Sequence, residues 1–289
     1  MKKAIIVFTT ALIFLIFLIF FVFLSFNDGK LHLVICDVGQ GDAIFIRTPS
    51  RADILIDGGP DKKVLECLSK HMPFWDRSLD LVIMTHPDSD HSTGLVDVIK
   101  RYEVRSFYTE AIPGQTDIYK LLKATLAEKK LSAKYLHEGN KLNENSGFSM
   151  KTIWPSTKAI ELTDQNKTNL RLNELSVIEV ISYGNFKILL TGDAGFDVMD
   201  HIADEAGDID VLKVPHHGSK TGMSDKFLSL TKPELALISV GEKNKYGHPA
   251  KISLDLLKEH HVKILRTDLD GEIEIVSDGS TWSVKTSRN

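Results

Sequence analysis

The chain has 289 residues, of which 43% are hydrophobic and 26% charged, and its formal net charge is −4 at pH 7. This length and composition are typical of one large globular domain or two small ones, and they exclude a mainly disordered chain. The excess of acidic residues excludes a general phosphate-binding surface. Any contact with nucleic acid would have to be local and assisted by metal ions.

The chain begins with an apolar segment. Lys2 and Lys3 precede residues 4–26, which contain no charged side chain. A bilayer span needs about 20 such residues, so we predict a membrane anchor within a domain of residues 1–29. The second domain, residues 30–289, would then lie outside the cytoplasmic membrane. A cleaved signal peptide followed by secretion is the alternative, although its apolar region is usually only about 7–15 residues long, and a buried core helix is a third interpretation.

The two cysteines lie in different settings. Cys36 is part of an apolar strand, and Cys67 lies on an expected helix. An exported domain permits a disulfide between them, but their spacing alone does not establish one. Because cysteine is often simply a small core residue, we expect two buried free thiols.

Short runs rich in valine and isoleucine alternate with amphipathic stretches after the first segment. Strands are expected at residues 31–37, 43–48, 53–57, 80–84, 104–108, 133–137, 150–154, 175–182, 186–191, 209–213, 235–239, 262–265, 272–276 and 281–285. Helices are expected at residues 61–71, 92–101, 115–129, 195–205, 224–230 and 251–260, and a polar surface loop at 156–173. This order predicts an α/β sandwich in which helices cover two packed sheets.

Four side chains of metal-binding type follow one expected strand within seven residues. The strand is followed by Thr85–His91, which reads Thr-His-Pro-Asp-Ser-Asp-His. Because Pro87 cannot continue a ladder, we expect a loop here before a helix that begins near Ser92 or Thr93. Aspartate and serine are also ordinary turn residues, but four ligand types at this spacing favour a metal site. The candidate ligands are His86, Asp88, Asp90 and His91.

Two further strand ends carry ligand-type residues. The strand at 186–191 is followed by Gly-Asp, and a carboxylate at a sheet edge suits the bridging of two cations, so Asp193 is a candidate. His216 and His217 follow the strand at 209–213. Since adjacent side chains on extended backbone point in opposite directions, we expect only one of them to contact a metal ion. The other could bind substrate or support a ligand.

Together these segments resemble the metallo-β-lactamase superfamily, and in particular the metallo-β-lactamase-like domain of the DNA-uptake channel proteins of competent bacteria. The match extends over residues 31–280 in the family's order. Its most specific part is Asp-Val-Gly-Gln-Gly-Asp-Ala, at residues 37–43. The other matching segments are residues 55–59, 85–94, 189–194, 214–219, 246–249 and 266–271.

The resemblance implies a four-layer αββα sandwich with a two-metal site at one edge of the paired sheets. The superfamily pattern is His-x-His-x-Asp-His, and this chain has Asp88 at the second histidine position. A hard oxygen ligand there makes two Mn²⁺ ions an alternative to two Zn²⁺ ions. Many members supply a further histidine before the bridging aspartate, but in this interval the chain has only His137, far from the expected strand end.

The family's roles carry over by motif position. His86 and Asp88 would bind one metal ion, Asp90 and His91 the other, and Asp193 would bridge them. The remaining ligand would be His216, with His217 as the alternate. Asp90, His217 and His248 are the residues expected to take part in catalysis. Residues expected to support the site are Asp42 and Asp57.

His248 has two interpretations. It could reach the site from a late loop, to contact a substrate oxygen or to protonate a leaving group. It could instead be a histidine that Pro249 orders in a surface turn.

The expected chemistry is metal-dependent hydrolysis. Two cations about 3.5–4 Å apart can activate a hydroxide at neutral pH and neutralise a developing oxyanion. Our leading hypothesis is a phosphodiesterase, specifically a nuclease acting on DNA or RNA outside the membrane, with local positive charge from Lys213, Lys220 and Arg266. Alternatives are a hydrolase of small phosphoesters or cell-wall phosphodiesters and a non-catalytic binding module in DNA uptake; β-lactam hydrolysis fits the signatures less well. With one apolar segment, the chain would need a separate DNA-uptake pore as a partner.

Overall fold

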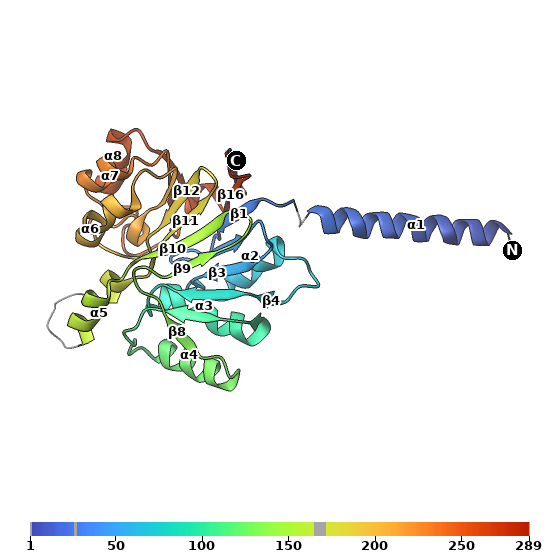
Figure 1. The fold of residues 1–289 in the computed structure, drawn as a ribbon, viewed down its shortest axis with the longest axis horizontal. Helices are drawn as coiled ribbons and strands as arrows, with labels where there is room; N and C mark the ends of the chain where they lie inside the picture. The colour runs from blue at the N-terminus through green and yellow to red at the C-terminus, as the bar shows by residue number, and fades with distance from the viewer. Residues whose placement is uncertain (1, 26–27, 165–171, 289) are drawn as a thin grey trace.

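Two large β-sheets pack face to face in the computed structural model, which describes residues 2–25, 28–164 and 172–288 (Figure 1). The first sheet contains β1 (Leu31–Ile35), β2 (Ile44–Arg47), β3 (Asp53–Ile56), β5 (Leu81–Met84), β7 (Phe107–Thr109), β8 (Ala133–Tyr135), β16 (Ile273–Ser277) and β17 (Trp282–Thr286). Within the described residues its strand order is β17-β16-β1-β2-β3-β5-β7-β8.

The second sheet runs through the later part of the chain. It contains β9 (Lys141–Asn143), β10 (Phe148–Trp154), β11 (Ile178–Tyr183), β12 (Phe186–Leu190), β13 (Val211–Lys213), β14 (Leu235–Ile238) and β15 (Lys263–Arg266). Its strand order is β15-β14-β13-β12-β11-β10-β9. A short ladder of β4 (Ser78–Leu79) and β6 (Glu103–Val104) stands apart from both sheets.

The helices of the globular part cover the outer faces of both sheets. The helices are α2 (Lys63–His71), α3 (Ser89–Arg101), α4 (Asp117–Glu128), α5 (Thr157–Asp164), α6 (Phe196–Ala206), α7 (Asp225–Thr231), α8 (Lys251–Glu259) and α9 (Thr267–Asp270). Side chains of α2, α3 and α4 pack on the first sheet, and those of α6, α7 and α8 on the second. The predicted four-layer αββα sandwich is therefore confirmed.

The alternation of side chains along each strand explains the layers. In β1, Leu31, Leu33 and Ile35 belong to the core between the two sheets, whereas Val34, and Cys36 just after the strand, pack toward the helices. Successive side chains of a strand point to opposite faces of the sheet. Since both faces of β1 are buried, the strand is apolar almost throughout.

Strand direction decides where the functional residues gather. β3, β5 and β7 are parallel neighbours in the first sheet, and β12, β13 and β14 are parallel neighbours in the second. The carboxyl ends of parallel strands meet at one edge of a sheet. The backbone N–H of Val177 donates to Thr85 O at 2.9 Å, which joins the two sheets at this edge.

Several predicted boundaries differ from the structure. Helix α3 begins at Ser89, not near Ser92 or Thr93 as predicted, so Asp90 and His91 lie in its first turn. Asp88 is the extended residue that precedes the helix, and the backbone N–H of Ser92 already donates to its carbonyl. The prediction was wrong because Asp88, Ser89 and Asp90 are of residue types that are common both in loops and at the start of helices.

The polar region at 156–173 was predicted as a surface loop. It contains α5 and the beginning of a 3-10 turn, Leu172–Leu175, so the loop prediction is wrong for these residues, while residues 165–171 lie outside the described part of the chain. The short strand β9 was not predicted either. Its side chains are all exposed, so it lacks the apolar pattern by which strands are recognised.

The N-terminal helix α1 (Lys2–Ser25) lies apart from the two sheets (Figure 1). Of its side chains the structure describes Lys3 and residues 5–18. Within the described part of the chain, no helix has both the length and the hydropathy that a membrane span requires. The anchor predicted at residues 4–26, whose last residue lies outside the described part, is therefore not supported here. The division into residues 1–29 and 30–289 stays a prediction.

A disulfide joins the end of the first strand to α2. Cys36 and Cys67 are bonded, with their Cα atoms 5.8 Å apart, and both are buried among the apolar side chains between the first sheet and its helices. The expectation of two free thiols is wrong. It rested on how often cysteine is a small core residue, and the sequence contains no sign that α2 packs over the end of β1.

Candidate metal centre

Three buried histidines are held through Nδ1, so that each presents Nε2 to a common centre. The partners of Nδ1 are Asp57 Oδ2 for His91 at 2.7 Å, Ser239 O for His217 at 2.9 Å, and Thr85 Oγ1 for His86 at 3.0 Å. A backbone carbonyl can only accept, so His217 carries its proton on Nδ1 when neutral and leaves Nε2 free as a ligand. Such partners fix both the ring orientation and the tautomer of a metal-binding histidine.

Asp57 organises two of these histidines. Its Oδ1 accepts the backbone N–H of Thr85 at 2.7 Å, and its Oδ2 accepts the Thr85 hydroxyl at 2.6 Å in addition to His91. Because the Thr85 hydroxyl donates to Asp57, its oxygen is left to accept from His86 Nδ1. Asp57 was predicted as a supporting residue, and it lies where that role requires.

The Asp193 carboxylate lies at the middle of the predicted ligands. Its Oδ1 is 3.3 Å from His91 Nε2, and its Oδ2 is 3.5 Å from His217 Nε2. His217 Nε2 is also 3.5 Å from Asp90 Oδ2. The four residues Asp90, His91, Asp193 and His217 form a group whose ligand atoms all lie within 4.8 Å of one another.

Three of the separations in this group suit the ligands of a tetrahedral metal ion. Ligand atoms about 2.0–2.1 Å from one zinc ion are separated from each other by about 3.3–3.5 Å, and the distances above are 3.3 and 3.5 Å. Nε2 of His91, Nε2 of His217 and Oδ1 of Asp193 are buried and have no hydrogen-bond partner. Buried polar atoms are normally satisfied, so their common orientation indicates a cation between them.

A second, wider group lies on the other side of Asp193. His86 Nε2 is 3.8 Å from Asp88 Oδ2 and 3.9 Å from Asp193 Oδ2, and His216 Nε2 is 3.7 Å from the same Asp193 oxygen. His86 Nε2 is again buried without a partner. The predicted first-metal ligands thus come together, with Asp193 placed between the two groups.

The two neighbouring histidines both face Asp193, contrary to the expectation that only one would approach. They lie in a 3-10 turn, Pro215–Gly218, with φ values of 49° at His216 and 53° at His217. The premise of extended backbone is therefore wrong. Left-handed conformations at residues other than glycine cost about 1–3 kcal/mol and tend to occur at functional sites. His217 is buried and belongs to the tight group, whereas the side chain of His216 is 33% exposed.

His248 lies beside the centre. Its ring centroid is 5.7 Å from that of His216, and its Nδ1 is buried without a partner. Burial, together with the nearby His216 and His217, lowers the pKa of His248. The Asn244 side chain holds the backbone of His248, because its amide donates to His248 O at 2.7 Å and accepts from the His248 backbone N–H at 3.0 Å.

The glycine-containing loop at residues 37–42 packs directly against the metal-binding segment. A Cβ added to Gly41, whose φ is 125°, would lie 2.0 Å from Asp90 O, so only glycine fits there. The next residue, Asp42, forms a buried ion pair with Lys213, with 2.7 Å between Asp42 Oδ2 and Lys213 Nζ. The loop therefore supports Asp90 and approaches His217, whose Nδ1 is 3.5 Å from Asp42 Oδ1.

Of the three cationic residues predicted to contact substrate, two are already paired. Lys213 is fully buried against Asp42, so its predicted role is wrong: it follows an apolar strand into the interior. The Arg266 guanidinium binds the Asp268 carboxylate. Lys220, two residues after Gly218, is exposed.

The electrostatics of the centre favour a bound cation. Burial by itself lowers the pKa of His217, but the charges of Asp193 and Asp42 outweigh it and raise that pKa to about 9. Conversely, burial would raise the pKa of Asp90, but His217 and His91 hold it at about 2. Without metal, protonated imidazoles supply the positive charge that these carboxylates require; metal ions can replace those protons.

Sequence reasoning missed several residues that orient the ligands. Ser176 Oγ lies 3.3 Å from His86 Nδ1 and accepts the backbone N–H of Asp193 at 3.2 Å, and Ser239 fixes His217. A serine side chain at a strand end is too common to signal the role of Ser176, and Ser239 contacts His217 through its backbone carbonyl, a group that every residue has. Asp42, Asp57 and His91 also form a compact group, but Asp57 already accepts three hydrogen bonds and Asp42 is paired with Lys213.

Comparison with protein families identifies the family of this chain. Residues 52–226 match the family described as the beta-lactamase superfamily domain. The chain belongs to this superfamily. This membership and the candidate metal cluster at the sheet edge agree with a metal-dependent hydrolase.

Relatives of this superfamily domain include competence proteins. The chain is 28% identical over 268 residues to ComE operon protein 3 of Bacillus subtilis, covering 86% of this chain and 33% of that protein. It is 26% identical over 254 residues to competence protein ComA of Neisseria gonorrhoeae, covering 86% and 32%. The chain thus spans about a third of the length of the curated relatives it matches. The resemblance to the competence group is confirmed.

Solved structures agree on the fold. The metallo-beta-lactamase fold protein YhfI from Bacillus subtilis has a TM-score of 0.54 and 13% identity, covering 82% of this chain and 96% of that one. The beta-hydroxylase CmlA from Streptomyces venezuelae has a TM-score of 0.52 and 14% identity, covering 82% and 52%. At such identities the likeness concerns the fold alone.

Proposed function

We propose that this superfamily domain is a two-metal phosphodiesterase that cleaves DNA or RNA. The observation that carries the proposal is the ring of unpartnered ligand atoms around Asp193, with the tight group of Asp90, His91 and His217 on one side and His86 with His216 on the other. The competence relatives favour a nucleic acid as the substrate.

Each residue of the centre has an assigned part. Asp90, His91, Asp193 and His217 would hold one divalent ion, and His86, Asp88 and His216 would complete the other with Asp193. The ions, Zn²⁺ or Mn²⁺, would supply charge neutralisation at phosphate oxygens and an activated water. His248, whose ring lies next to that of His216, would contact a substrate oxygen. Because its pKa is lowered, its imidazole is mainly neutral near pH 7 and would donate a proton to the leaving group more readily at lower pH.

The proposed place of action is outside the cytoplasmic membrane, beside a separate DNA-uptake pore. The disulfide between Cys36 and Cys67 supports an exported domain, because disulfides persist in oxidising compartments and are rare in the cytosol. Protease added to intact cells tests this location. Degradation of the domain without cell lysis is the expected result, and protection until lysis would contradict it.

Activity is tested with the full-length chain loaded with zinc or manganese. Single-stranded DNA, double-stranded DNA, RNA and bis-p-nitrophenyl phosphate are compared as substrates. We expect metal-dependent cleavage of a nucleic acid that falls at least about 100-fold in Asp90→Ala and Asp193→Ala. Asp204→Ala removes an exposed aspartate on α6 and serves as the matched control, with activity unchanged.

A different substrate is the second candidate. The net charge of −4 and the burial of Lys213 leave little positive surface for a long polyanion, which favours small phosphoesters or cell-wall phosphodiesters. Cleavage of bis-p-nitrophenyl phosphate without cleavage of any nucleic acid would support this candidate. Metal binding with no hydrolysis at all would indicate a non-catalytic module in DNA uptake.

A further inference from the structure

A cavity separate from the metal centre lies between the two sheets. Its volume is about 320 Å³, at the lower end of the range for small-molecule sites, about 300–1,000 Å³. Ala52, Asp80 and Ser106, which line it, precede β3, β5 and β7. The metal ligands follow the other ends of β5 and β12, so the cavity extends toward the opposite edge of the sheets.

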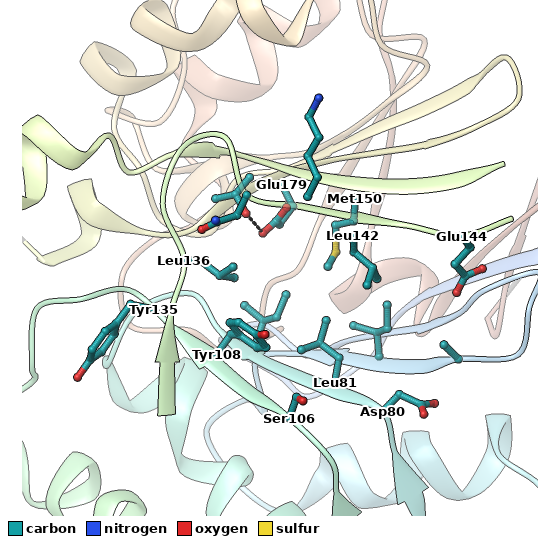
Figure 2. Close-up of a pocket in the computed structure, with 16 residues that line it drawn as sticks. Asp80, Leu81, Ser106, Tyr108, Tyr135, Leu136, Leu142, Glu144, Met150 and Glu179 are labelled. Atoms are coloured by element: carbon teal, nitrogen blue, oxygen red, sulfur yellow. Dashed lines mark hydrogen bonds between the residues drawn. The ribbon is translucent and has the colours of Figure 1, made fainter. Parts of the chain in front are cut away.

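The wall of this cavity is mainly apolar, as Figure 2 shows. Side chains from both sheets take part, among them Leu81, Tyr108, Leu136, Leu142 and Met150. Apolar pockets that hold small ligands usually contain a few polar groups that fix the ligand's orientation. In this cavity one polar group is unusually deep.

That group is the carboxyl of Glu179, which is only 2% exposed. Ile181 of β11 and Val177, just before this strand, alternate with Glu179 and belong to the core between the sheets, so the pleat aims Glu179 into the same space. Its Oε1 accepts the Thr152 hydroxyl at 2.7 Å, drawn as a dashed line in Figure 2. Its Oε2 is buried and has no hydrogen-bond partner.

Two other buried carboxylates have internal cations, whereas Glu110, which does not line this cavity, has none among the described residues. Asp42 is paired with Lys213 at 2.7 Å, and Asp53 with Arg47 at 2.7 Å. Among the described residues, Glu179 has no such ion pair. Burial raises the pKa of Glu179 to about 8, as expected for a carboxyl that lacks a cation. Glu179 Oε2 thus lacks a hydrogen-bond partner. Lys141 also lines the cavity, but among the described residues no ion pair joins it to Glu179. A cationic donor at Oε2 would satisfy this atom and favour the ionised carboxylate.

We propose that this cavity binds a small organic ammonium ion, with the ammonium group on Glu179 Oε2 and an apolar body between Leu81, Leu142 and Met150. The site goes beyond the hydrolysis proposed for the metal centre and uses none of its ligands. Asp80 and Glu144 line the cavity as well. Both carboxylates have partners of their own: the Asp80 carboxylate pairs with Arg105, and that of Glu144 accepts from Thr48 at 2.7 Å.

The test is calorimetric titration of the full-length, zinc-loaded protein with 2-phenylethylamine. The matched neutral and anionic probes are 2-phenylethanol and phenylacetate, which share the apolar body but lack the ammonium group. We expect saturable binding of the amine to one site, at least about tenfold tighter than that of the alcohol, and no binding of the carboxylate. This comparison needs no variant and does not depend on catalysis, so its failure would leave the proposed hydrolase untouched.

Three variants locate the site. Glu179→Gln keeps the size of the side chain and should weaken amine binding at least about tenfold, while Leu142→Trp should block the cavity. Glu205→Gln, on α6, removes the same charge outside the cavity, where the carboxylate pairs with Lys151 at the surface, and should bind the amine as the wild type does. Circular dichroism confirms that each variant is folded.

Some results would overturn the proposal. These are equal affinities for the amine and the alcohol, undiminished binding in folded Glu179→Gln, or no amine binding up to about 10 mM.

Discussion

At the scale of single residues, the centre depends on side chains that hold the ligands as much as on the ligands themselves. Asp57 accepts three hydrogen bonds, two from Thr85 and one from His91. An asparagine would offer one acceptor oxygen in place of two. The position thus requires a carboxylate, although Asp57 does not belong to the tight group around Asp193.

Asp57→Asn should therefore lower metal affinity. We expect a loss of about 10–100-fold, because the His91 imidazole would no longer be held in its orientation. Calorimetric zinc titration measures this effect. Asp204→Asn, on the exposed face of α6, is the matched control, and equal affinities in the two variants would contradict the assigned role of Asp57.

Metal binding should also release protons. The charges of Asp193, with Asp42 for His217 and Asp57 for His91, outweigh burial: they raise the pKa of His217 to about 9 and that of His91 well above its ordinary value. Both imidazoles are thus protonated at neutral pH without metal, and must lose the proton to become ligands. Apparent affinity should rise with pH from about 6 to 9. Calorimetry in two buffers of different ionisation enthalpy measures the release, and identical heats in both would argue against it.

At the scale of elements, most candidate ligands could be predicted because they directly follow strands. Candidate ligands directly follow an apolar strand in three segments: Thr85–His91, Asp193 and His216–His217. Because the carboxyl ends of parallel strands meet at one edge of a sheet, these segments are expected to lie at such an edge. The directions in which the His216 and His217 side chains point could not be predicted. The positive φ values in Pro215–Gly218 turn both histidines toward Asp193, whereas the prediction that only one approaches assumes extended backbone.

The disulfide is an element-scale feature, since it ties the end of β1 to α2. It closes a loop with a sequence separation of 31, for which loop-closure entropy indicates a stabilisation of about 2–4 kcal/mol. The double variant Cys36→Ser, Cys67→Ser should lose this amount in urea denaturation under oxidising conditions. In the presence of reductant the wild type should approach the variant. A variant as stable as the oxidised wild type would show that the bond does not constrain the unfolded chain.

At the scale of the whole molecule, the two sheets enclose a core that is apolar except for groups such as Glu179. Its folded pKa of about 8 exceeds the ordinary value of about 4.3. The folded state favours the protonated Glu179 carboxyl. The stabilisation that Glu179 contributes is therefore complete below about pH 4.3 and is lost as the pH rises toward 8.

Glu179→Gln does not titrate and isolates this effect. The free energy of unfolding of the wild type, relative to that of the variant, should fall between about pH 5 and 8. Urea denaturation at several pH values measures this difference. Glu205→Gln should show no comparable trend, and a pH-independent difference for Glu179→Gln would contradict the raised pKa.

The sequence pattern by itself determined an α/β sandwich of two packed sheets and the positions of most candidate ligands, and the family resemblance added the four-layer αββα order. The sandwich and the ligand positions are both written locally, the first in runs of valine and isoleucine and the second in polar residues that directly follow those runs. Only the tertiary structure decided that Cys36 meets Cys67, that Lys213 is buried on Asp42, that Ser239 orients His217, and that Glu179 faces a cavity. Each of these depends on which surfaces pack together across distant parts of the chain, and no local pattern of residues contains that information.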